Sequence, residues 1–129
     1  MRQMISDIIE AFAKERGYSY TTDIVPTALA GGMHYPALLW VAPDATFDAS
    51  RGRWTFKSTL YLVAAVDNNL SVSTQLSKLE DDAAALAMLL CNNDVVSAEP
   101  SVQCRPKFAI DNSGANAIEG QVTIYAYDC

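Results

Sequence analysis

His34 is the only histidine in this sequence of 129 residues, so any reaction that needs an imidazole base depends on it. A cysteine nucleophile could pair with it, as Cys91–His34 or Cys104–His34. The three cysteines, which include Cys129, lie far apart, contain no CxxC pair and carry no sign of an activated thiolate. Buried or incidental reduced thiols are the favoured interpretation, and a single histidine does not suit a structural zinc site. We expect no catalytic residue, no metal site and no bound cofactor.

Carboxylates are densest at Glu80-Asp81-Asp82, which could bind a metal ion or serve in acid–base catalysis. Consecutive residues of a helix point in different directions, so a solvated or interface surface is the favoured interpretation. The pair Gly31-Gly32 lacks the surrounding pattern of a phosphate-binding loop and predicts a bend. The prominent aromatic residues are expected in the core or at an interface, although any one of them could line a ligand pocket: Trp40, Trp54, Tyr61, Tyr125 and Tyr127.

The composition indicates a single globular domain over residues 1–129. Half of the residues are hydrophobic and 19% are charged, which excludes a disordered chain. The formal net charge is −6 and the basic residues are scattered, so we expect no tight binding to nucleic acid. The apolar runs are far shorter than the roughly 20 residues that span a bilayer, and the first residues do not form an export signal. We therefore expect a protein that is made inside the cell and has no membrane partner.

The core is predicted to form between a long strand, residues 54–66, and a helix, residues 72–91. Side chains alternate across a strand, and the even positions of this one are apolar: Trp54, Phe56, Leu60, Leu62, Ala64 and Val66. The odd positions become apolar from Tyr61 onward, so the second half is expected to be covered on both faces. The helix has one apolar stripe, formed by Leu76, Leu79, Ala83, Leu86 and Leu90. Lys78 and the carboxylates at 80–82 lie outside the stripe, and Ser71 or Ser73 is the expected N-cap.

Shorter elements are predicted on both sides of this pair. Before it come a helix at 2–16 that stops at Gly17, a strand at 18–22, a loop at 25–35, a buried strand at 37–42 that ends at Pro43, and a polar loop at 44–53 that closes a hairpin. After it come short strand-like pieces at 95–96 and 101–105, a turn at 111–116 and a last strand at 120–127. The order α-β-β-β-α-β-β predicts an α+β fold, in which two helices pack on one face of a mainly antiparallel sheet.

Taken together, these segments resemble a known family. The stretch Tyr35–Asp44, the strand Trp54–Asp67, the helix 72–91 and the closing segment Glu119–Tyr127, preceded by the helix 2–16, are similar to the tail terminator and tail completion proteins of tailed bacteriophages. The resemblance covers nearly the whole chain. It implies a non-enzymatic structural subunit that forms a ring, commonly six-fold, at the end of the tail tube or at the head–tail neck.

The resemblance also implies where the protein works and what it contacts. Its partners would be copies of itself, the tail tube protein and neck or connector proteins, within a virion whose parts are made in the host cytoplasm. The loops 25–35 and 44–53 would be candidates for contacts with neighbouring subunits, and the family offers no catalytic residue to assign. An acidic ring would let DNA pass through without binding its phosphates.

A second interpretation stays open. A monomeric or dimeric α+β domain that binds a ligand or acts as an enzyme, with a pocket lined by the sheet aromatics, would have the same patterns, because such sheets host many functions. Closed rings would separate the first interpretation from the second.

Overall fold

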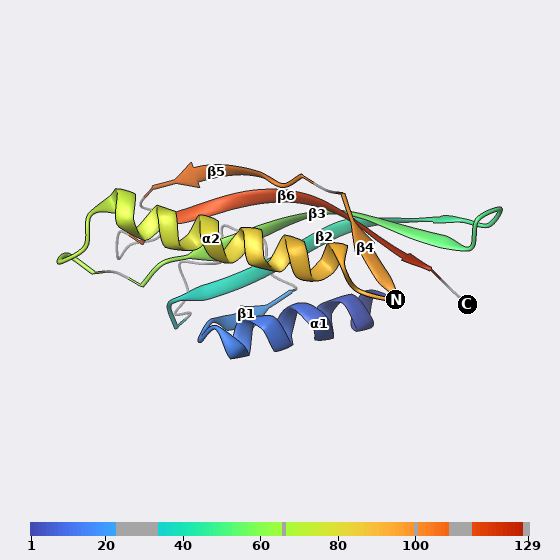
Figure 1. Ribbon diagram of the computed structural model, residues 1–129, viewed down its shortest axis with the longest axis horizontal. Helices are drawn as coiled ribbons and strands as arrows, with labels where there is room; N and C mark the ends of the chain where they lie inside the picture. The colour runs from blue at the N-terminus through green and yellow to red at the C-terminus, as the bar shows by residue number, and fades with distance from the viewer. Residues whose placement is uncertain (23–33, 66, 100, 109–114, 128–129) are drawn as a thin grey trace.

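The computed structural model describes residues 1–22, 34–65, 67–99, 101–108 and 115–127, which form two helices and six strands (Figure 1). Their order is α1 (Arg2–Glu15), β1 (Ser19–Thr21), β2 (Ala37–Asp48), β3 (Arg53–Val63), α2 (Val72–Cys91), β4 (Val96–Ala98), β5 (Gln103–Lys107) and β6 (Ala117–Tyr127). The predicted α+β class is confirmed. The predicted order has two strands after the second helix, whereas the structure has three.

The strands form one mixed, mostly antiparallel sheet in the order β1-β2-β3-β6-β4, and β5 also pairs with β6. β1 runs parallel to β2, and the other pairings are antiparallel. β6 pairs with β3 over its whole length, while its other edge pairs with β5 through residues 117–121 and with β4 through residues 124–126. The extra strand arises because the two short pieces after α2 pair with different halves of β6.

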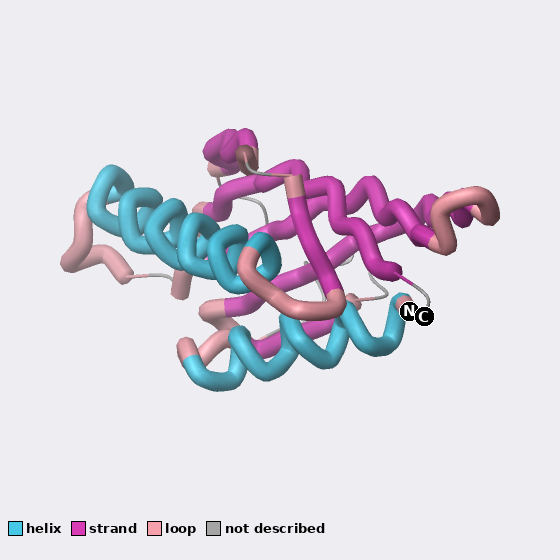
Figure 2. Tube along the Cα trace, turned by 45° about the vertical axis from the view of Figure 1, so that its right-hand side comes forward, coloured by secondary structure: helices cyan, strands magenta, loops and turns pink. Residues whose placement is uncertain are grey.

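Both helices cover the same face of the sheet, as predicted (Figure 2). Even positions of β3, among them Phe56 and Leu60, join Ile5 and Ile9 of α1 in one buried cluster. The predicted stripe of α2 completes the cluster with Leu79, Ala83, Leu86 and Leu90. Burial of apolar area in this cluster is the main force that holds the helices on the sheet.

The opposite face of the sheet carries a smaller apolar cluster at one end. It is formed by Ala37, Leu39, Val63, Ala115 and Ala117, with Tyr35 and Tyr61 packed against it. The prediction that β3 is covered on both faces in its second half is therefore confirmed at Val63. It is wrong at Ala65, which lies beyond the end of the strand and is exposed.

The ends of the two helices follow the sequence signals. Arg16 caps α1, and Gly17 then turns the chain with a φ of 81°, a conformation that costs glycine little. At the start of α2, the Ser71 side chain accepts a hydrogen bond from the Thr74 backbone N–H at 3.1 Å. Of the two predicted N-caps, Ser71 is the correct one.

The predicted polar loop at 44–53 is wrong over its first half, because β2 continues to Asp48. β2 has two residues, Ala42 and Pro43, where β3 has only Ser58, and this bulge shifts the register. Before the bulge the even positions of β2 face the helices, and after it the odd positions do. The apolar run that predicted this strand ends at Ala42, and the residues beyond Pro43 are mainly polar, which explains why the predicted strand stopped there.

The long hairpin that results reaches past both helices (Figure 1). Residues 44–57 of β2 and β3 form its outer part, which we call the projecting hairpin. Its turn is only residues 49–52, with Gly52 at a φ of 60°. Several predicted features lie outside the described residues: Val66, most of the loop 25–35 with Gly31-Gly32, most of the turn 111–116, and Cys129.

Candidate functional site

The prediction that residues 80–82 form a solvated or interface surface is wrong for Asp82. This side chain is buried, with 5% of its surface exposed. It lies on α2 opposite the end of α1 and accepts hydrogen bonds from three side chains. Arg16 Nη1 donates at 2.9 Å, Lys78 Nζ donates at 3.2 Å, and the Tyr18 hydroxyl donates as well. Asp82 is three residues after Leu79 and four before Leu86, so its place at the margin of the buried stripe could have been found from the sequence.

The pKa values in this cluster follow from its contacts. Burial alone would raise the pKa of Asp82, but the hydrogen bonds from Tyr18 and Lys78, with the charges of Lys78 and Arg16, lower it overall. Burial, and then the hydrogen bond to Asp82, raise the pKa of Tyr18. Asp82 is therefore an ionised acceptor whose donors are supplied by the protein itself, and it joins the two helices.

The other carboxylates of the predicted cluster do not converge on Asp82. Glu80 and Asp81 are exposed, and no group of acidic, cysteine or histidine side chains in the described ranges could hold a metal ion. The residues 80–82 thus point in different directions, as a helix requires.

His34 and Cys91 lie near opposite ends of α2. His34 is exposed and is two residues from Pro36, which lines a pocket of about 180 Å³ together with Thr74 and Lys78. Cys91 is about 25 Å further along the helix from Thr74, because a helix rises about 1.5 Å per residue. Cys91 is also exposed, so of the two interpretations, buried or incidental, burial does not apply to this thiol.

Cys104 is the more enclosed of the two described thiols. It lies on β5 and is half-buried. Burial, and then the negative charge of Glu80, raise the pKa of its thiol, which makes it a weaker nucleophile at neutral pH. No hydrogen bond joins His34 to Cys91 or Cys104 in the part of the chain that the structure describes.

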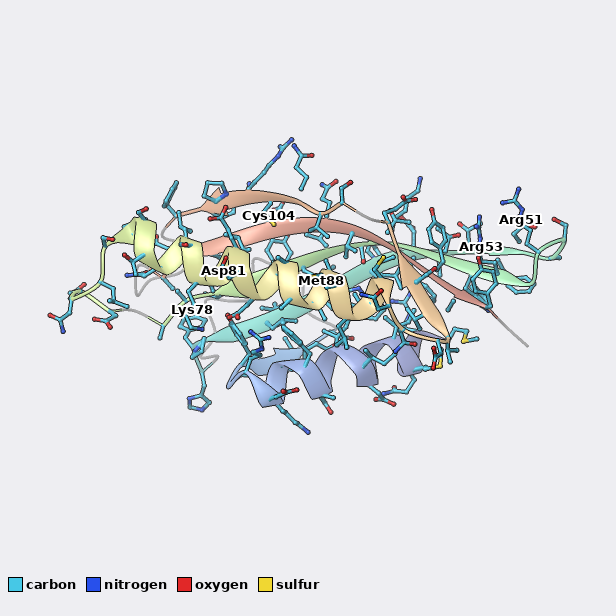
Figure 3. The ribbon with its side chains drawn as sticks, viewed as in Figure 1. Arg51, Arg53, Lys78, Asp81, Met88 and Cys104 are labelled. Carbon is cyan, nitrogen blue, oxygen red and sulfur yellow. The ribbon has the colours of Figure 1, made fainter. Side chains whose placement is uncertain are left out.

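Both of these cysteines line a groove between α2 and β5, which we call the α2–β5 groove. Its volume is about 560 Å³ and its walls are Glu80, Ala84, Ala87, Met88, Cys91, Asn92, Val102 and Cys104. On α2 the small residues Ala84, Ala87 and Cys91 form a second stripe beside the buried one. Met88 stands at the groove with 66% of its surface exposed (Figure 3). The groove could not be recognised from the sequence, because its second wall, Val102 and Cys104, comes from a segment that is distant from α2 in the chain.

A row of aromatic side chains runs from the core onto the projecting hairpin, on the face that the helices cover elsewhere. The row begins at the buried Trp40, which lies 6.1 Å from Phe56 between ring centroids. It continues through Trp54, at 6.2 Å from Phe56, to Phe47, at 5.0 Å from Trp54. Phe47 is 42% exposed, so the apolar face of the sheet extends past the cover of the helices. Trp40 is a core residue, as predicted, whereas Trp54 and Phe47 approach solvent.

The end of the projecting hairpin carries two arginines (Figure 3). Arg51 is mainly exposed and lies 3.7 Å from Asp48, whose pKa is lowered chiefly by a hydrogen bond from the Ser50 side chain. On the face away from the helices, the Arg53 guanidinium stacks over the Tyr125 ring at 4.5 Å. The hairpin has three cations and two carboxylates, a net charge of +1, so the rest of this chain of net charge −6 carries −7.

A scan of the sequence against models of known protein families found no match, and neither did a search of curated proteins. Neither helix of the described ranges is long and apolar enough to cross a membrane.

Proposed function

We propose that this chain is a non-enzymatic structural subunit of a phage tail or neck, which assembles with copies of itself into a ring next to the tail tube. The observation that carries the proposal is the projecting hairpin. The end of the hairpin reaches past the helices and leaves Phe47 42% exposed, while every ordered residue costs conformational entropy. A hairpin of this kind becomes favourable when a neighbouring molecule covers it.

The composition of the exposed surface supports association. Interfaces are enriched in aromatic side chains, methionine and arginine, and Phe47, Arg51 and Met88 are all exposed. The large apolar side chains at the surface include Phe47, Leu70, Val72, Met88, Leu89, Val95, Phe108 and Tyr127. They are distributed over the hairpin, α2 and the strands after it, which suits a subunit with neighbours on more than one side.

The alternative, a ligand-binding or enzymatic domain, has less support from the pockets. Ligand sites usually have volumes of about 300–1,000 Å³. An apolar pocket between Tyr18 and Leu70 measures about 180 Å³. The recess at Trp54 and Phe56 measures about 240 Å³. The larger α2–β5 groove contains none of the sheet aromatics that the alternative requires.

The proposal is tested by the mass and shape of the assembled protein. We expect light scattering after size exclusion to give a discrete multiple of the subunit mass at high concentration, or on addition of the tail tube protein encoded beside it. Electron microscopy should then show closed rings on tube ends, which an unrelated acidic protein of similar size does not form. A strict monomer that ignores the tube contradicts the proposal. So does a gene neighbourhood without portal, head or tail-tube genes.

A further inference from the structure

We infer that the projecting hairpin of one subunit inserts its Phe47 side into the α2–β5 groove of the next subunit. The inference rests on the proposed ring, because a closed ring needs a head-to-tail contact between two different surfaces of the same chain. The structure supplies one protruding and one recessed surface, on different elements.

The two surfaces match in shape and polarity. Phe47 and Trp54 lie side by side on the hairpin, and each aromatic side chain can bury about 150–250 Å². The groove has a volume of about 560 Å³. Its helical wall is built from the small residues Ala84 and Ala87, which allow another chain to approach closely, and from Met88, a side chain that adapts to an aromatic partner.

The two surfaces also match in charge. The hairpin has a net charge of +1 and carries the exposed Arg51 at its turn, whereas the rest of the chain carries −7. Glu80 lines the groove, and among the described residues it forms no ion pair that would compensate its charge. A symmetric contact of hairpin end with hairpin end would instead bring the Arg51 side chains of two copies together, and like charges repel. Charge complementarity therefore selects the groove of a second copy as the site where the hairpin binds.

A disulfide between subunits tests this contact, because the groove has its own cysteines. The donor chain carries Phe47→Cys with all three native cysteines replaced by serine. The acceptor chain keeps Cys91 and Cys104, keeps Phe47 and carries Cys129→Ser. On mild oxidation of the mixture we expect a disulfide between donor and acceptor. A control donor with Leu70→Cys in the same background, equally exposed but on another surface, should form none. Donor chains that crosslink only to one another overturn the inference.

Substitutions on the two surfaces provide a second measurement. Phe47→Ser and Ala84→Trp, which fills the groove, should each raise the concentration needed for half-assembly about tenfold or more, as expected for interface hot spots. The matched controls are Leu70→Ser and Ser77→Trp, which is exposed on α2 outside the groove. Melting curves check that each monomer is folded.

The two proposals fail in different ways. If the wild-type chain forms no ring, alone or with the tube protein, the proposed function fails. If rings form but Phe47→Cys gives no disulfide with the groove and Phe47→Ser assembles normally, the hairpin contact is wrong while the proposed function stands.

Discussion

At the scale of single residues, Asp82 has the most demanding environment. Its side chain is nearly excluded from water, yet it stays ionised because Arg16, Lys78 and Tyr18 all donate to it. Removing the charge while keeping the shape would leave two cations without the negative charge that balances them. The cost of burying a charge is offset here only by complete pairing.

We expect Asp82→Asn to lower the free energy of unfolding by about 1.5–3 kcal/mol, the usual contribution of hydrogen bonds to a charged group. The folded-state pKa of Asp82 lies below the unfolded value of about 3.9, so its contribution is complete above that value and is lost as the pH falls through the folded pKa. Urea melts at several pH values should show a constant deficit near neutral pH that narrows below about pH 4.

The matched control is Asp81→Asn, one residue earlier and exposed. It should change the stability by less than about 0.5 kcal/mol at any of these pH values. If Asp82→Asn lowers the free energy of unfolding no more than Asp81→Asn does, the cluster around Asp82 does not contribute to stability.

The partners of Asp82 also show what sequence reasoning could not supply. Spacing along α2 places Asp82 beside the buried stripe, but Tyr18 is 64 residues away in the chain. Only the packing of α1 beside α2 brings them together. Cys91 is the opposite case, since it follows the buried Leu90 by one residue and points outward, as the spacing of helix residues leads one to expect.

At the scale of elements, α2 provides a direct comparison between neighbouring leucines. Leu86 is fully buried and Leu89 is 43% exposed. We expect Leu86→Ala to cost about 2–5 kcal/mol, because it leaves a cavity in the core. Leu89→Ala should cost less than about 1 kcal/mol, as a surface site does. Denaturant melts of both variants measure these costs. A larger loss of unfolding free energy for Leu89→Ala would mean that the buried face of α2 is assigned wrongly.

The start of α2 gives a second matched pair. Ser71→Ala removes the side chain that caps the Thr74 N–H and should cost about 0.5–2 kcal/mol. Ser73→Ala removes a hydroxyl two residues further along the chain, and it should change the free energy of unfolding by less than about 0.5 kcal/mol. Thermal melts that rank Ser73 as the more important residue would contradict the observed cap.

Predicting the elements was most successful where one periodicity continued unbroken. Both helices, β3 and β6 follow the alternation or the stripe of their apolar residues. β2 did not, because the bulge at Ala42 and Pro43 reverses its alternation. The α2–β5 groove was out of reach for the same kind of reason, since no local pattern tells which strand comes to lie beside a helix.

At the scale of the whole molecule, the layer of two helices on one sheet face could be predicted, because apolar faces must meet. The pairing of β6 with three partners could not, because registers between distant strands depend on the complete structure. The proposed function depends on this scale as well, since the projecting hairpin and the groove belong to different elements.

We expect the single histidine to be dispensable. His34→Ala should support particle assembly at about the wild-type level in complementation of a phage that lacks this gene, with folding checked by melting. Phe47→Ser is the matched comparison, and it should fold but fail to complement. A folded His34→Ala protein that fails completely would favour an enzyme.

The central position of β6 has a consequence for how the chain is synthesised. β6 follows every other element in the sequence, yet it lies between β3 and both β4 and β5. A ribosome synthesises the chain from the N-terminus onward. Until β6 emerges, β3 therefore has one unpaired edge, and β4 and β5 have no strand to pair with. Pairing across such sequence separations is slow and leaves open edges exposed to other nascent chains. We expect this protein to depend on chaperones during its synthesis more than its small size suggests.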